Sequence, residues 1–164
     1  MRLRPLREDD FEALYAAAAD PLIWAQHPAK DRHERAVFEP YFAFLLASAT
    51  TLAVEDAESG QIVGCSRFYE TPPPQRALSI GFTFLTRAHW GGIFNYEMKR
   101  LMLNHIFATR AEAWFHIDPA NIRSQRATEK LGAVFVGEEE LDLGTGTGRW
   151  RSYRLLKDDW TARL

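Results

Sequence analysis

Two stretches of the sequence place flexible or polar residues where a ligand could reach the backbone. Gly91 and Gly92 lie between an apolar run, residues 77–85, and a run of helix-forming residues that follows them. Asn121 and Ser124 lie at the start of a later helical run. Backbone N–H groups at the beginning of a helix lack partners within the helix and attract anions. Both stretches are therefore candidate anion sites, although glycine also serves in ordinary turns and asparagine as an ordinary helix cap.

Other chemistry-bearing residues give weaker signals. The glycine-rich segment 143–149 is flanked by strand-like runs, which favours a hairpin turn over a phosphate loop. Neither a dinucleotide fingerprint nor a Walker-type lysine motif is present. The five histidines and Cys65 show no metal-ligand spacing, so we expect no metal. Cys65 is expected to be a small buried residue, and His116, on a strand-like run, a core histidine whose polar atoms are satisfied.

The periodicity of the chain predicts the elements that must position these residues. Strands are expected at 1–6, 50–56, 61–70, 77–85, 112–117, 133–143 and 149–156. Helices are expected at 9–20, 34–48, about 95–109 and 121–132. The second is expected to be kinked or restarted at Pro40, and the last to have Asn121 as its N-cap and Gly132 just past its end. Residues 21–33 and 71–75 are expected to be loops. This order predicts a mixed α/β fold with a central strand–helix–strand crossover.

Two of these elements have predicted core faces. In the strand at 77–85, residues that alternate with smaller ones should face one way, namely Leu78, Ile80, Phe82 and Phe84. In the helix at 95–109 and just before it, three- and four-residue spacings predict one apolar face, formed by Phe94, Met98, Leu101, Met102 and Ile106.

Length and composition limit the class of protein. The chain has 164 residues, which suggests one domain over 1–164, and 46% of them are hydrophobic, enough for a sizeable core. A formal net charge of -2 gives no reason to expect a nucleic-acid or membrane partner. The single cysteine excludes an internal disulfide, and neither a signal-peptide core nor a membrane-length apolar run is seen. We therefore expect a cytoplasmic protein, as a monomer or a homodimer.

Two blocks of the sequence carry a resemblance to a known family. The first is "IGFTFL" followed by the Trp90–Gly91 pair, and the second is N-x-x-S-x-x-x-x-E-K-L-G over residues 121–132. In these blocks the chain resembles the GNAT superfamily of acyl-CoA-dependent N-acyltransferases, and is most similar to the branch of ribosomal-protein N-terminal (RimJ/RimL-like) acetyltransferases. The resemblance implies a single-domain α/β fold with about six to seven strands, about four helices and splayed central parallel strands.

The first block departs from the family signature, Gln/Arg-x-x-Gly-x-Gly/Ala. Aligned through the Trp–Gly pair, the signature covers residues 90–95, so Ile93 and Asn95 stand where the family has glycine. Gly92 is expected to relax the turn one residue earlier. Backbone N–H groups survive any substitution other than proline, so the departure leaves the predicted donors in place.

The resemblance also implies a ligand set. Acetyl-CoA would be the co-substrate and a primary amine the acceptor, either a protein N-terminus or a small molecule. Cofactor contacts would come from the end of the strand at 77–85, the glycine turn and the later helix, namely Phe84, Leu85, Thr86, Trp90, Gly91, Gly92, Ile93, Phe94, Asn95, Asn121 and Ser124. The acceptor would lie near Trp24, His27, Arg67 and Tyr69. Arg67 and Tyr69 are equally consistent with a solvated sheet face.

The reaction needs a neutral amine, and this decides how much a base matters. A terminal α-amine has a pKa of about 7.7–8.0, whereas a lysine amine has one near 10.4 and is far less often neutral at pH 7. His27 is the candidate base, although its position beside Pro28 favours an ordinary loop residue. Ser124 is the candidate hydrogen-bond donor to the departing thiolate. A non-catalytic acyl-CoA-binding or sensor domain is the alternative reading.

Overall fold

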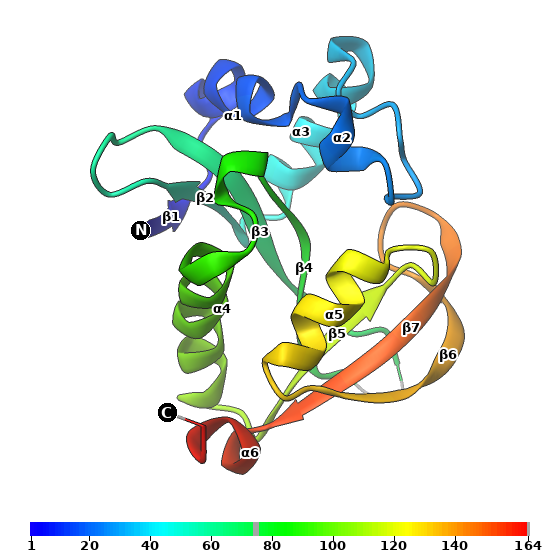
Figure 1. The fold of residues 1–164 in the computed structure, drawn as a ribbon. Coiled ribbons are helices and arrows are strands. Elements are labelled where there is room, and N and C mark those ends of the chain that lie inside the picture. Colours follow the sequence, from blue (N-terminus) through cyan, green and yellow to red (C-terminus); the bar gives the residue numbers. More distant parts are fainter. Residues whose placement is uncertain (74–75, 164) are drawn as a thin grey trace. The chain divides into compact units, whose positions relative to one another are not determined.

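The structure, a computed structural model, describes residues 1–73 and 76–163 (Figure 1). In these residues seven strands form one mixed sheet in the order β1-β2-β3-β4-β5-β7-β6, together with six α-helices. The chain divides into two compact units, residues 1–68 with 82–100 and residues 69–81 with 101–164. No helix in the described part of the chain is long and apolar enough to span a membrane. The α/β class and the number of strands agree with the prediction.

The elements follow one another closely along the chain. The strands are β1 (Arg2–Pro5), β2 (Thr51–Glu55), β3 (Ile62–Glu70), β4 (Leu78–Leu85), β5 (Glu112–Ile117), β6 (Val134–Asp142) and β7 (Thr147–Leu156). The α-helices are α1 (Phe11–Ala18), α2 (Pro21–Trp24), α3 (Arg35–Ala47), α4 (Gly92–Phe107), α5 (Ile122–Lys130) and α6 (Lys157–Thr161), and two 3-10 turns are η1 (Glu8–Asp10) and η2 (Arg87–His89).

The first unit is built on antiparallel pairing of β1 with β2 and of β2 with β3. Its core combines residues of α1, α2 and α3 with one residue each from β3 and β4, and most of its aromatic residues come from α3. The cluster comprises Leu14, Ala17, Ala18, Ile23, Trp24, Phe38, Tyr41, Phe42, Leu45, Cys65 and Phe84. Cys65 is fully buried, as predicted. Each large apolar side chain buried here contributes about 1.5–3 kcal/mol, so the early helices are held mainly by this packing.

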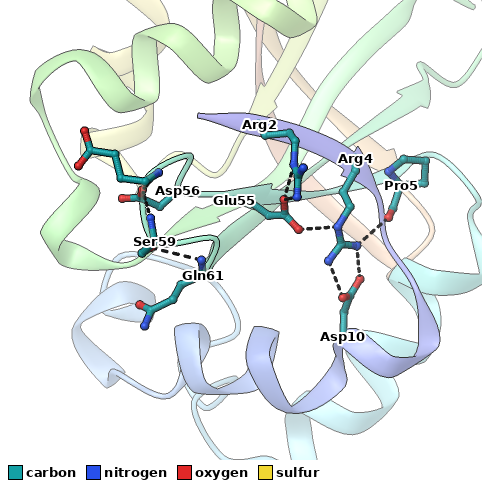
Figure 2. Close-up of polar contacts among 9 residues, drawn as sticks. Arg2, Arg4, Pro5, Asp10, Glu55, Asp56, Ser59 and Gln61 are labelled. Atoms are coloured by element: carbon teal, nitrogen blue, oxygen red, sulfur yellow. Dashed lines mark hydrogen bonds and ion pairs between the residues drawn. The ribbon is translucent and has the colours of Figure 1, made fainter.

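The basic residues near the N-terminus form ion pairs within the first unit (Figure 2). Arg2 and Arg4 both donate to the carboxylate of Glu55, at 2.6 and 2.5 Å, and Arg4 also donates twice to Asp10 at 2.7 Å. Burial favours a higher pKa for Glu55, but the hydrogen bonds from the two arginines hold its pKa below the ordinary value. These arginines therefore connect β1, β2 and η1.

The second unit contains antiparallel β5–β7 and β6–β7 ladders, and β4 joins β5 in parallel at Ser79 and Trp114. Helix α5 covers the face of β7 that carries Tyr153, whose hydroxyl donates to Glu129 of α5 at 3.4 Å (Figure 1). Side chains on a strand alternate between faces, so residues that pair with Ser152 lie on the face opposite α5. His116 is such a residue.

Several elements differ from the prediction. Residues 21–33 were expected to be a loop, but they begin with α2, because Pro21 suits the first helical position and the Asp20 carboxylate accepts from the N–H of Leu22. Helix α3 is not restarted at Pro40, since one helix runs through it and buries neighbouring aromatic residues. Helix α4 begins three residues earlier than expected, and α6 was not predicted. In the loop predicted at 71–75, residues 74 and 75 lie outside the described residues.

Candidate functional site

The glycine turn leads directly into α4. Gly91 has a φ of 65°, a left-handed conformation that favours glycine, and a Cβ there would meet no atom within 4 Å. The left-handed residue is therefore Gly91, and Gly92 already begins the helix. Ile93, which stands at a family glycine position, is 61% exposed and fills no core space. Because α4 begins at Gly92, the N–H groups of residues 91–94 have no intrahelical acceptor.

His89 fixes this turn to the rest of the first unit. Its Nδ1 lies 2.6 Å from the hydroxyl oxygen of Thr86, and its Nε2 lies 3.5 Å from a carboxylate oxygen of Asp56. The ring also packs edge-on against Phe94, with the ring centroids 4.6 Å apart. The interaction with Asp56 could not be anticipated, because it joins residues more than thirty positions apart.

The end of β4 already has hydrogen-bond partners. The indole N–H of Trp90 donates to the carbonyl of Leu85 at 2.9 Å, and the N–H of Thr86 donates to the carbonyl of Val63 at 2.8 Å. The side chains of Phe84 and Leu85 are both 5% exposed. Phe84, Leu85 and Thr86, which were predicted to contact the cofactor, could therefore offer mainly backbone groups. A ligand that bonded to the Leu85 carbonyl or to the Thr86 N–H would compete with the bonds that these groups already make.

A buried lysine lies beside β4 and was not predicted. The amine of Lys99 donates to the hydroxyl of Thr83 at 2.9 Å, and that hydroxyl lies 2.6 Å from the hydroxyl of Ser66. Burial lowers the pKa of Lys99 to about 7, and an electrostatic contribution from Cys65 opposes this shift. A lysine on an amphipathic helix normally faces water, so no sequence pattern predicted that Lys99 would be buried.

Asn121 and Ser124 lie together at the start of α5, in the second unit. The side-chain oxygen of Asn121 accepts from the N–H of Ser124 at 3.2 Å, so the predicted helix cap is confirmed. Gly132, with a φ of 96°, follows the end of the helix as predicted. Ser124 is partly exposed in the first turn, and Asn121 is only 9% exposed. The cap fixes the position of Ser124 relative to the carboxyl end of β5.

The predicted acceptor residues of the first unit are more buried than expected. Trp24 is 2% exposed and its indole N–H donates to the carbonyl of Ala18 at 2.8 Å. His27 packs edge-on against Trp24, with centroids 5.4 Å apart. The N–H of Ala29 lies 3.0 Å from Nδ1 of His27, and the Arg32 guanidinium lies 3.1 Å from its Nε2. Both ring nitrogens of His27 therefore lie beside hydrogen-bond donors. A proton added at Nε2 would point toward the positively charged guanidinium of Arg32.

Arg67 and Tyr69 do not form a solvated sheet face. The Arg67 guanidinium lies over two rings of the first unit, 4.7 Å from the centroid of Phe44 and 4.9 Å from that of Phe82. Tyr69 belongs to the second unit and is 8% exposed. Its hydroxyl oxygen lies 2.7 Å from Nδ1 of His116. Of the predicted acceptor residues, Trp24, His27 and Arg67 belong to the first unit and Tyr69 to the second.

His116 is not the fully satisfied core histidine that the sequence suggested. Tyr69 engages Nδ1, but Nε2 is buried and has no hydrogen-bond partner among the described residues. Burial lowers the pKa of His116 to about 4, and the carboxylate of Glu139 opposes the shift. The imidazole is therefore neutral at pH 7. In the described residues no group of three or more His, Cys, Asp or Glu side chains could hold a metal ion.

Comparison with known proteins identifies the family. Residues 1–134 match the family described as an acetyltransferase (GNAT) domain, and the chain belongs to it. No curated protein matches the sequence significantly.

Solved structures share the fold. A GCN5-related N-acetyltransferase from Brucella melitensis has a TM-score of 0.82 and 21% identity, over 98% of this chain and 77% of its own. RimJ from Mycobacterium smegmatis, in complex with CoA-disulfide, has a TM-score of 0.69 and 16% identity, over 96% and 82%. Spermidine N-acetyltransferase from Vibrio cholerae, in complex with CoA and spermine, has a TM-score of 0.66 and 16% identity, over 98% and 97%. The predicted GNAT fold is confirmed.

Proposed function

We propose that this protein transfers the acetyl group of acetyl-CoA to a primary amine by direct attack in a ternary complex. Membership of the GNAT acetyltransferase family, from a match over residues 1–134, is the observation that carries the proposal. The amine is a protein N-terminus or a small molecule. That two proteins of the same fold were crystallised with CoA or a CoA derivative, one of them also with spermine, supports an amine acceptor of this general kind.

The residues of each unit fit parts of this chemistry. In the first unit, Gly91 leaves the backbone open where α4 begins, and a helix N-terminus favours the negative charge of a pyrophosphate. In the second unit, Asn121 would bind the pantetheine arm, and Ser124 would donate a hydrogen bond to the sulfur as the thiolate leaves. Much of the rate would come from holding the two substrates together.

A non-catalytic acyl-CoA-binding domain is the second candidate function. It is favoured by the engaged carbonyl of Leu85 and by the exposed Ile93 in place of a signature glycine. The two functions are separated by measuring free thiol released from acetyl-CoA with a panel of amines that includes peptides with free N-termini. Release that depends on the amine supports the transferase. Stabilisation by CoA with no turnover of any amine supports the binding domain, and absence of CoA binding contradicts both.

Replacement of Asn121 tests its predicted contact with CoA. Asn121→Ala is expected to weaken CoA binding, and loss of the helix cap should also lower the free energy of unfolding by about 1 kcal/mol. Asn121→Ser is the matched control, because serine caps helices well but lacks the amide. Calorimetric titration with CoA should show weaker binding for both variants, with near-normal stability for Asn121→Ser. Normal CoA affinity in Asn121→Ser would restrict Asn121 to its capping role.

Replacement of Ser124 tests the predicted donor to the thiolate. Ser124→Ala is expected to lower kcat about tenfold while KM for acetyl-CoA changes little, because a hydrogen bond to a developing charge forms mainly in the transition state. Alanine is a good helix former, so α5 should remain intact. Steady-state kinetics with a saturating amine would measure the effect. An unchanged kcat would show that Ser124 has no such role.

A further inference from the structure

The second unit contains a polar cluster apart from the residues proposed to bind CoA. Its members are Tyr69 near the end of β3, His116 near the end of β5, Ser152 on β7 and Glu139 on β6. The Tyr69 hydroxyl lies 2.7 Å from Nδ1 of His116, and the Ser152 hydroxyl donates to the Glu139 carboxylate at 2.7 Å. His116 and Ser152 are register partners on β5 and β7, so this cluster lies on the face of the sheet opposite α5.

The position of Tyr69 is built closely into the fold. A Cβ on Gly81 would lie 2.7 Å from Cε1 of Tyr69, so the tyrosine ring lies directly on backbone that only glycine leaves free. The His116 ring stacks near Trp114, with centroids 6.4 Å apart and planes 13° from parallel. The imidazole thus has two aromatic neighbours, since the Tyr69 ring centroid also lies 5.8 Å from its own. With Nδ1 engaged by Tyr69, the nitrogen left for another group is Nε2.

The state of Nε2 calls for an explanation. This atom is buried in a side chain that is 7% exposed, and it has no hydrogen-bond partner among the described residues. A buried polar atom without a partner costs roughly 1–3 kcal/mol, and such atoms are uncommon outside functional sites. His116 also lies one residue before the end of β5, and the chain then leads into the α5 start that carries Asn121 and Ser124. Carboxyl ends of parallel strands are common ligand sites in α/β folds.

We propose that His116, oriented by Tyr69, is the residue that takes up the proton of the attacking amine through Nε2. This assignment rests on the proposed acetyltransferase function. The neutral amine donates a hydrogen bond to Nε2, and its nitrogen forms a bond to the thioester carbonyl carbon. The proton passes to Nε2, the carbon–sulfur bond breaks, and the thiolate takes up a proton as CoA leaves. His116 then releases its proton to solvent.

Two features of the cluster support this role. The low pKa of His116 keeps the imidazole neutral at pH 7, and the assignment requires the tautomer in which Nδ1–H donates to the Tyr69 oxygen, which leaves the lone pair on Nε2. The Glu139 carboxylate, fixed by Ser152, favours the imidazolium once the proton has moved. His27 is less suited to the role, because the Arg32 guanidinium already faces its Nε2 at 3.1 Å.

The test compares four proteins, the wild type with His116→Gln, Tyr69→Phe and, as control, His105→Gln at an exposed position on α4, in the free-thiol assay at constant pH. With His116→Gln we expect kcat/KM for the amine to fall about 100-fold, while CoA affinity stays normal. The fall should be larger for lysine-type amines than for α-amines, because the amine of higher pKa depends more on a base. Tyr69→Phe should show a fall of about tenfold with the same dependence on the amine, and His105→Gln should show little change.

Each outcome decides the assignment. It is overturned if His116→Gln keeps more than half of the wild-type kcat/KM, or if its loss is equal for all amines and accompanied by lost CoA binding. Wild-type protein that binds CoA but acetylates no amine contradicts the proposed function itself, and the assignment with it. If the variants do not fold, nitrogen-15 NMR of histidine-labelled wild type with CoA and an amine decides. A shift of the His116 Nε2 resonance on adding the amine supports the contact, and no shift contradicts it.

Discussion

Gly64→Ala is expected to destabilise the protein by roughly 4 kcal/mol or more, the largest effect of any single methyl group that we predict. A Cβ on Gly64 would lie 2.0 Å from the backbone carbonyl oxygen of Phe84 and 2.9 Å from its carbon. These are backbone atoms at the end of β4, so no rotamer change relieves the clash. The strands would have to separate, and residues 84–86 would move with them. Any Gly64→Ala protein that stays soluble should therefore also bind CoA poorly.

Urea denaturation, followed by circular dichroism, measures this effect. Gly137→Ala is the matched control, since a Cβ at that strand position would meet no atom within 4 Å, and the free energy of unfolding should change by less than about 1 kcal/mol. Equal free energies of unfolding for the two variants would show that β3 and β4 tolerate the added methyl group. That result would contradict the predicted clash with the Phe84 carbonyl.

Most of the fold could be predicted from sequence, because periodicity and turn residues are local signals. The strand at 62–70, the cap at Asn121 and the glycine after α5 all depend on neighbouring residues. The positions that were predicted wrongly depend on packing between residues distant in the sequence. Phe82 was expected to alternate with its neighbours, yet it adopts a φ of 51° and is only partly buried, so the two-residue period breaks within β4. Leu101, expected in the core, is 39% exposed.

The candidate site was predicted less completely than the fold. Glycine and asparagine at helix starts are visible in a sequence, which is why the turn at Gly91 and the start of α5 were found. The Tyr69–His116 pair joins residues 47 positions apart, and no local pattern reports it. The paired residues do have one sequence signal in retrospect. Gly81, in the middle of an otherwise bulky strand, indicates that a side chain packs directly on the backbone there.

Lys99→Met is expected to raise the free energy of unfolding at pH 7 by roughly 1–3 kcal/mol. Folding buries the amine and lowers its pKa from 10.5 to about 7, so between these values the unfolded chain binds more protons than the folded one. The free energy of unfolding of the wild type should therefore increase as the pH rises from 7 toward 10.5. The contribution of Lys99 to this free energy is lost as the pH falls toward 7. Methionine has a similar length and no charge, and Thr83 keeps its contact with Ser66.

Urea denaturation of the wild type and Lys99→Met at several values between pH 7 and 10 isolates this contribution, because other titrating groups cancel in the difference. The advantage of the variant should be greatest near pH 7 and shrink as the pH rises. Lys130→Met, at an exposed position on α5, is the control and should show no such trend. A difference that does not vary with pH would mean that Lys99 stays charged in the folded protein. A buried lysine beside β4 with its pKa lowered to about 7 therefore predicts a stability profile that the net charge of the chain does not suggest.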